Sequence, residues 1–138
     1  IRITEIPAPT FKEAKRGEYF LKRFAELGLQ NVRVDKVGNV IGERRGANAK
    51  KTLVLAAHLD TVFDETTDVT VKRDGDLLKA PGISDDGRGL TLLLAIARAL
   101  NLARIETDGT IIFVANVAEE GLGDLKGMRH LFGEELKD

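Results

Sequence analysis

The sequence predicts an α/β fold with a mostly parallel sheet flanked by helices. Apolar runs typical of strands alternate along the chain with longer segments typical of amphipathic helices, which is the pattern of layered α/β domains. The run at 52–57 is apolar enough to be a strand buried on both faces, as in a parallel sheet. With 138 residues, 43% of them hydrophobic and 31% charged, the chain has the composition of one globular domain around a single core.

The first predicted element is a helix that begins at Thr10 and ends at Gly28. Pro7 and Pro9 hold the preceding segment extended, and the Thr10 hydroxyl is a suitable N-cap. Gly28 supplies a typical helix end. The apolar face of this helix consists of Phe11, Ala14, Tyr19, Phe20, Phe24 and Leu27.

Strands and turns are predicted for the next part of the chain. Gly38 and Asn39 are flanked by branched residues, with Val32, Val34 and Val37 before them and Val40 and Ile41 after them. This pattern predicts two short strands joined by a tight turn. Residues 46–50 predict a loop before the strand at 52–57. Around Asp74 and Gly75, residues 69–79 have the pattern of a hairpin.

The second half of the chain predicts helix, strand and helix. Residues 89–102 form a strongly apolar helix, with a turn at Asp108 and Gly109 leading into a buried strand at 110–117. A last helix begins near Asp124. The apolar positions of the two helices are Leu90, Leu93, Leu94, Ala97 and Leu100, and then Leu125, Met128 and Leu131.

Composition excludes several classes of function. The formal net charge is -1 with both signs interspersed, so the chain has no electrostatic footprint for nucleic acid or for an anionic membrane surface. No apolar run approaches the roughly 20 residues of a membrane span. The absence of cysteine excludes disulfides and a thiol nucleophile and favours a cytoplasmic location. Because the chain opens at Ile1, a removed signal segment stays open as an alternative.

His58 and Asp60 follow the apolar run at 52–57. In α/β sheets ligands bind beyond the carboxyl ends of strands, and residues two apart in an extended chain point the same way. Asp60 can therefore accept a hydrogen bond from one imidazole nitrogen while the other nitrogen faces a metal. For this pair taken alone, a solvated polar strand end is the competing interpretation.

Two more acidic pairs lie at comparable positions. Asp85 and Asp86 stand in a glycine-rich turn before the apolar helix, where a simple helix N-cap is the alternative. Glu119 and Glu120 end the strand at 110–117, where adjacent carboxylates repel each other unless solvent or a cation intervenes. Three such coincidences at corresponding ends of apolar elements together predict the metal site of a hydrolase.

These segments resemble a family of zinc-dependent exopeptidases and amidohydrolases that includes tripeptide aminopeptidase (peptidase T), glutamate carboxypeptidase, aminoacylase and acetylornithine deacetylase. The similar segments are His-Leu-Asp-Thr-Val at 58–62, the stretch at 80–89, Glu-Glu-Gly at 119–121 and the opening at 6–10. The resemblance covers nearly the whole chain and implies the α/β catalytic domain of zinc exopeptidases, a phosphorylase/hydrolase-like fold.

The resemblance also implies a role for each residue. His58 would bind one metal, Asp85 would bridge two metals and Glu120 would bind the second. Glu119 would be the general base, and Asp60 would orient His58. The two ions would be divalent, foremost zinc, with cobalt or manganese as alternatives.

The implied reaction is hydrolysis of a peptide bond by a water molecule that two metals activate. The resemblance places Asp86 after a cis peptide bond, as a supporting residue and not a ligand. The substrate would be a peptide or an N-acyl amino acid, and the full-length parent would be a homodimer. Two alternatives stay open, namely an N-acyl-amino-acid deacylase of the same family and a non-catalytic binding or scaffold domain.

The chain also departs from the family pattern. The resemblance calls for a further acidic ligand, an inserted lid or dimerisation domain and a distant histidine ligand, none of which the sequence contains. The remaining histidine, His130, is predicted to be a surface residue of the last helix. We therefore expect residues 1–138 to be the N-terminal portion of a catalytic domain, inactive alone and a weak metal binder.

Overall fold

The computed structural model describes residues 1–136, apart from the side chain at position 49. Within this range no helix has the length and apolar composition needed to cross a membrane. The elements, in chain order, are α1 (Ala14–Glu26), β1 (Gln30–Val34), β2 (Val40–Arg44), β3 (Asn48–His58), β4 (Lys72–Asp74), β5 (Leu77–Lys79), α2 (Gly87–Leu102), β6 (Gly109–Asn116), the 3₁₀ turn η1 (Gly121–Gly123), α3 (Lys126–His130) and the π-helical turn η2 (Leu131–Glu135).

The main sheet has four strands in the order β1-β2-β6-β3. The predicted α/β class is confirmed, but the prediction of a mostly parallel sheet is wrong, since only β3 and β6 pair in parallel. The cause is the connections between strands. A short turn joins β1 to β2 and permits only antiparallel pairing, whereas α2 lies between β3 and β6 and provides the long crossover that parallel strands require.

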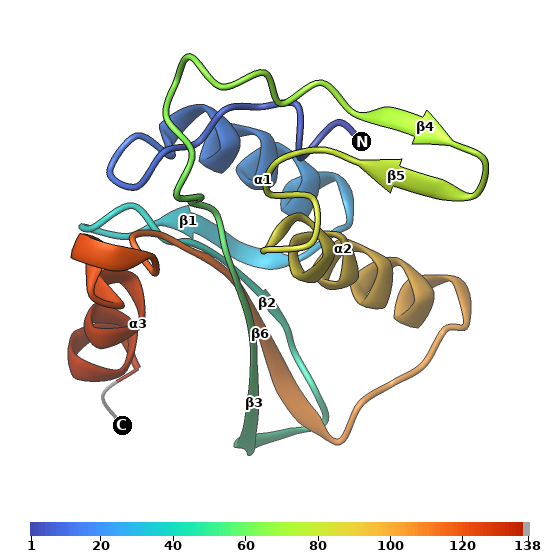
Figure 1. Ribbon diagram of the computed structural model, residues 1–138. Coiled ribbons are helices and arrows are strands. Elements are labelled where there is room, and N and C mark those ends of the chain that lie inside the picture. The colour runs from blue at the N-terminus through green and yellow to red at the C-terminus, as the bar shows by residue number, and fades with distance from the viewer. Residues whose placement is uncertain (137–138) are drawn as a thin grey trace.

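Helices pack on both faces of this sheet, with α1 and α2 on one side and α3 on the other (Figure 1). Phe113 of β6 is fully buried under the larger core, and Phe24 of α1 meets it edge to face with ring centroids 6.4 Å apart. On the opposite face Leu131 packs with Ile41 and Val114. The larger core also contains Phe20, Leu59, Leu90, Leu93, Ala97 and Ala115.

Strand β3 differs from its prediction in both length and burial. It begins at Asn48, so part of the predicted loop at 46–50 belongs to the strand. It was expected to be buried on both faces, but Leu53 is 55% exposed. The reason is position, because β3 is at the edge of the described sheet. The hairpin of β4 and β5 forms a separate two-stranded sheet, as predicted around Asp74.

The predicted start of the first helix is also wrong. Helix α1 begins at Ala14, and Phe11 has a φ of 71°, which interrupts any helix from Thr10. The Thr10 hydroxyl is instead engaged outside the helix, with Asp60. At the other end of the chain, Asp124 has a left-handed backbone, so α3 begins two residues later than predicted. The apolar helix and the strand near 110–117 are confirmed to within two residues.

Candidate metal centre

Three segments of the chain converge at one edge of the sheet. Strands β3 and β6 run in parallel with His58 paired to Asn116, so both strands end together. Glu119 and Glu120 follow β6 by a few residues, and Asp85 lies in the turn that leads into α2. The sequence had predicted this convergence from the polar residues that end each apolar element.

The predicted ligands come close together around His58. Its Nε2 lies 2.9 Å from a carboxylate oxygen of Asp85 and 3.9 Å from one of Glu119. Ligand atoms of His58, Glu119 and Glu120 all lie within 4.8 Å of one another. The side chain of Asp85 is 77% exposed, so the cluster opens to solvent on that side.

Hydrogen bonding fixes the protonation of the His58 ring. Nδ1 lies 3.0 Å from the backbone carbonyl of Asp60, which can only accept, so Nδ1 carries a proton and donates it. Nε2 then faces the Asp85 carboxylate at hydrogen-bonding distance. Two acceptors at 2.9 Å would repel each other, so this position requires a cation, either a proton or a metal ion.

The charges around His58 also favour a cation beside its Nε2 atom. Burial lowers the pKa of the imidazole, but hydrogen bonds to Asp60 and Asp85 and the charges of nearby aspartates outweigh it and raise the pKa to about 9. The pKa of Glu120 is also raised, first by burial and then by the neighbouring Asp85 charge. The cluster therefore carries an excess of negative charge that a cation relieves.

The Asp60 carboxylate anchors the two glutamates. It is fully buried and accepts hydrogen bonds from the backbone N–H groups of Glu119 and Glu120, each at 3.0 Å, and from the Thr10 hydroxyl. Burial raises its pKa, but these hydrogen bonds and that of His58 lower it overall to about 2. Its carboxylate is 3.5 Å from Nδ1 of His58, so it is the backbone carbonyl of Asp60 that makes the closer contact with the ring.

Asp86 supports the site without joining the cluster. Its carboxylate accepts from the backbone N–H of Gly89, which caps α2, and from the backbone N–H of His58 at 3.1 Å. The Asp85 to Asp86 peptide bond is cis, as the resemblance implied. This residue therefore connects the start of α2 to the end of β3.

The sequence did not reveal two buried charged residues that hold the backbone near the site, one just before α1 and one within it. Glu13 accepts from the backbone N–H of Ala118 at 3.0 Å, just before the glutamate pair. Arg16, 2% exposed, donates to the carbonyls of Leu59 and Ile6 at 2.6 and 2.5 Å. A signal was present, because positions 13 and 16 continue the helical spacing of the apolar face that the aromatic residues define.

The donor set fits a divalent metal. It comprises one imidazole nitrogen, already oriented by a carbonyl, and carboxylates from three separate residues, which are the ligand types of zinc and similar ions. The orientation of His58 by a hydrogen bond at its other nitrogen is the usual arrangement of metal-binding histidines.

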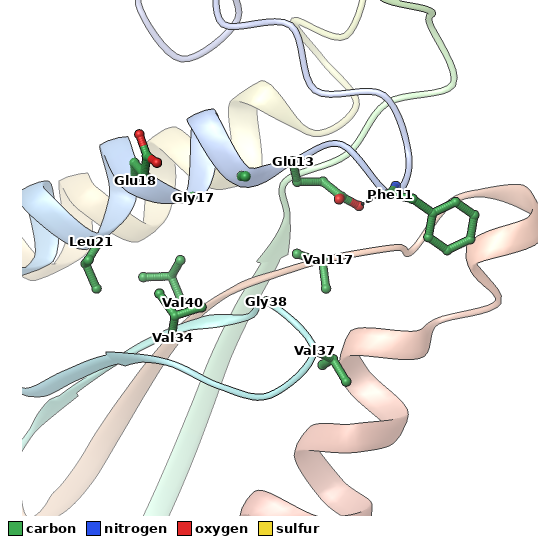
Figure 2. Close-up of a pocket in the computed structure, with 11 residues that line it drawn as sticks. Phe11, Glu13, Gly17, Glu18, Leu21, Val34, Val37, Gly38, Val40 and Val117 are labelled. Carbon is green, nitrogen blue, oxygen red and sulfur yellow. Dashed lines mark hydrogen bonds between the residues drawn. The ribbon is translucent and has the colours of Figure 1, made fainter.

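Two surface pockets lie near this edge of the sheet. Figure 2 shows one between the start of α1 and the β1–β2 turn, where Phe11, Val37 and Val117 contribute apolar walls. The Glu13 carboxylate in this pocket is already engaged with backbone N–H groups. The other pocket borders the cluster itself, and its lining includes Glu120 together with Pro9, Thr61, Val62, Phe63 and Leu122.

Comparison with known proteins places the chain in a family. The model of peptidase family M28 matches residues 39–137, well over half of the sequence. The chain belongs to peptidase family M28. The predicted relation to zinc exopeptidases and amidohydrolases is thereby confirmed at the level of the family, which supports an enzyme that hydrolyses peptide or related amide bonds.

Curated relatives of this M28 chain are hydrolases by name. A protein of Pyrococcus abyssi named as a putative LysW-lysine/LysW-ornithine hydrolase is 34% identical over 129 residues, covering 94% of this chain and 34% of the relative. Carboxypeptidase G2 of a Pseudomonas species is 30% identical over 131 residues, covering 90% and 31%. The chain thus spans about a third of the length of the curated relatives it matches.

Solved structures share the fold. A tripeptidase of Staphylococcus aureus superposes with a TM-score of 0.75 at 24% identity, over 99% of this chain and 39% of that one. A Bacillus subtilis protein described as a dinuclear metal-binding peptidase of family M20 gives a TM-score of 0.65 at 20% identity, over 94% and 37%. These likenesses support the fold of the M28 chain.

Proposed function

We propose that the protein to which this chain belongs is a metal-dependent exopeptidase that hydrolyses a peptide bond. The observation that carries the proposal is the position of His58, whose Nε2 faces Asp85 at a distance that requires a cation between or upon them. Membership of a peptidase family supplies the reaction class. The described cluster supplies the candidate residues.

In this proposal His58 would hold one divalent ion, Glu120 would hold a second, and Asp85 would be a ligand of both, with zinc as the foremost candidate. When bound, such ions lower the pKa of a water molecule and polarise the carbonyl that is attacked. Glu119, close to His58 but not needed as a ligand, accepts the proton of the attacking water. It then returns that proton to the leaving amine.

The surrounding residues hold this geometry before any substrate binds. Asp60 fixes the backbone N–H groups of both glutamates, and Thr10 completes its hydrogen bonds. Asp86 holds the backbone of His58 in place from the start of α2. His58, which ends a strand and is buried, loses little freedom on binding an ion, so this preorganisation favours catalysis.

The pocket beside Glu120 is the candidate site for a substrate side chain. Val62, Phe63 and Leu122 make its surface mostly apolar, while Glu120 connects it to the cluster. A side chain seated there would bring its neighbouring carbonyl to the candidate ligands. Such an arrangement, an apolar pocket with a few converging polar groups, is typical of small-molecule sites.

The chain contributes part of the proposed centre. Catalytic zinc usually has three protein ligands, and His58, Asp85 and Glu120 supply fewer than two ions require. Because the chain spans about a third of its curated relatives, we propose that residues 1–138 are the N-terminal portion of a catalytic domain. We propose further that the rest of the protein supplies the missing ligands and a lid or dimerisation domain. The whole protein would be a cytoplasmic homodimer.

A deacylase that acts on N-acyl amino acids is the second candidate. The names of the Pyrococcus relatives favour it, because they describe hydrolases of lysine or ornithine conjugates and not general peptidases. In either case the same groups would surround the scissile amide. The choice between the two depends on how the substrate's free end is bound.

The test uses the whole protein. After removal of metal with a chelator and dialysis, zinc, cobalt or manganese is returned and hydrolysis is measured on short peptides and on N-acyl amino acids. We expect activity that depends on the returned metal and is lost in His58→Ala. Hydrolysis that survives both chelation and His58→Ala would overturn the proposal, and faster hydrolysis of N-acyl amino acids would favour the second candidate.

A further inference from the structure

A second group of metal-binding side chains lies outside the candidate metal centre. His130 is on α3, Glu135 ends η2, and Asp35 opens the turn between β1 and β2. Single ligand atoms of these three residues lie within 4.8 Å of one another. None of the three takes part in the proposed hydrolysis. Figure 1 shows α3 on the face of the sheet opposite α1 and α2.

His130 is not the surface residue that the sequence predicted. Its side chain is 9% exposed, and its Nε2 is buried with no hydrogen-bond partner among residues 1–136. The nearest acceptors are a carboxylate oxygen of Asp35 at 3.9 Å and one of Glu135 at 3.8 Å, both beyond hydrogen-bonding distance. A buried polar atom left without a partner destabilises the fold.

A metal ion fits the space that a hydrogen bond does not fill. Zinc bonds to nitrogen and oxygen at roughly 2.0–2.2 Å, so two ligands in a tetrahedral site lie roughly 3.4 Å apart. The separations from Nε2 of His130 are 3.9 and 3.8 Å. Closing a gap of about 0.5 Å requires only small side-chain rotations, because the terminal torsions of histidine and the carboxylates are broad.

Asp35 is held in place before any ion binds. One of its carboxylate oxygens accepts from the backbone N–H groups of residues 37, 38 and 39 at 2.9–3.0 Å, and the other accepts from the Asn39 amide at 2.7 Å. The second oxygen is the one that faces His130, and a carboxylate oxygen can accept more than one bond. The same Asn39 amide donates to the carbonyl of Gly127, which fixes α3 against the turn.

The charges around the cluster leave room for a cation. One oxygen of Glu135 is 3.3 Å from the Arg33 guanidinium, and the other oxygen faces His130. Glu134 lies 3.7 Å from Nδ1 of His130 and 3.9 Å from the Lys36 ammonium. Arg33 thus engages the Glu135 oxygen that is not the one nearest His130, while Lys36 lies near the same Glu134 oxygen that is closest to Nδ1.

We propose that His130, Asp35 and Glu135 form a second divalent-metal site, which joins the β1–β2 turn to the C-terminal helix. One imidazole nitrogen and two carboxylates suit zinc or a similar ion, and three protein ligands leave a position for water. The ion supplies the missing partner of Nε2. Because the ligands come from elements 95 positions apart in sequence, from 35 to 130, its binding stabilises the folded chain.

The test is zinc titration of this chain followed by the imidazole signals in ¹H–¹⁵N spectra. The chain has two histidines, so His58→Ala leaves the signals of His130 alone. We expect zinc to shift the His130 Nε2 signal to saturation in His58→Ala, and to raise the melting temperature. Glu135→Gln should weaken this binding at least tenfold, which is about the loss caused by disturbing even the outer shell of a metal site.

Glu134→Gln is the matched control, because it makes the same change one position away on the Nδ1 side of the ring. We expect it to leave zinc affinity within about twofold, as for a surface substitution. If His58→Ala does not fold, the titration uses the wild-type chain. The His130 signals are then assigned as those missing from the spectrum of His130→Asn. A His130 signal that does not move with zinc, or affinity equal in Glu135→Gln and Glu134→Gln, overturns the second site and leaves the proposed hydrolase untouched.

Discussion

Replacing Asp60 by asparagine tests how the glutamate pair is held. The Asp60 carboxylate is fully buried, and its two oxygens accept from the backbone N–H groups of Glu119 and Glu120. Asparagine has nearly the same shape but offers only one acceptor oxygen. Whichever way the amide is turned, its NH₂ group faces a backbone N–H, so one buried donor loses its acceptor.

The magnitude follows from two contributions. The pKa of Asp60 falls from 3.8 to about 2 on folding, and at ~1.4 kcal/mol per pKa unit the ionised carboxylate contributes about 2 kcal/mol at neutral pH. The unsatisfied N–H group adds about 1–3 kcal/mol. We therefore expect Asp60→Asn to lower the free energy of unfolding by about 3–5 kcal/mol at pH 7.

Urea unfolding of wild type and variant measures this difference. Asp64→Asn is the control, because Asp64 is exposed and its hydrogen bonds are local to Thr66 and Thr67. We expect that control to change the free energy of unfolding far less than Asp60→Asn does. The reasoning is refuted if Asp60→Asn destabilises the chain no more than Asp64→Asn.

The same pair of proteins gives a pH test with a defined sign. The folded pKa of Asp60 lies below its ordinary value, so its ionised form stabilises the fold fully above pH 3.8. This contribution is lost as the pH falls through 2. The gap between wild type and Asp60→Asn should stay constant from about pH 5, below which His58 is protonated in both the folded and the unfolded state, to about pH 4, and should narrow below that. A gap that widens in acid contradicts the assignment.

Three further substitutions test the packing that supports the site. Phe113→Ala removes a fully buried ring from the larger core and should cost about 3–5 kcal/mol in urea unfolding, with Tyr19→Ala at the partly buried edge costing clearly less. Gly127→Ala places a methyl group against the Asn39 side-chain oxygen and the backbone of Val117, so calorimetric melting should show a loss of about 1–3 kcal/mol. Gly133→Ala, which meets nothing within 4 Å, should be nearly neutral. Arg16→Met leaves buried carbonyls without donors and should cost at least about 2 kcal/mol, and a neutral result would contradict its structural role.

The sequence was sufficient to locate the cluster because each predicted ligand lies directly beside an apolar run, after a strand for His58 and the glutamates and before a helix for Asp85. His58, Asp85 and the pair at 119–120 stand at element ends that sheet geometry brings to one edge. Local patterns of this kind survive folding, and the strand near 110–117 and the helix near 89–102 were predicted for the same reason.

Features that depend on tertiary position were not predictable. The exposure of Leu53 follows from the place of β3 at the sheet edge, which no local pattern in the strand encodes. Thr10 is a residue type that often caps helices, but its hydroxyl donates a hydrogen bond to Asp60, fifty positions away. The burial of His130 likewise requires the β1–β2 turn beside it, which carries Asp35.

The most direct test of the central claim is Glu119→Gln in the whole protein, with metal content and hydrolysis measured on the same sample. Glutamine keeps the shape of the side chain but cannot accept the proton of the attacking water. The account predicts unchanged metal content and a kcat lowered by about 10²–10⁴-fold, the usual contribution of a general base. Unchanged hydrolysis, or a loss of activity that only parallels a loss of metal, would contradict it.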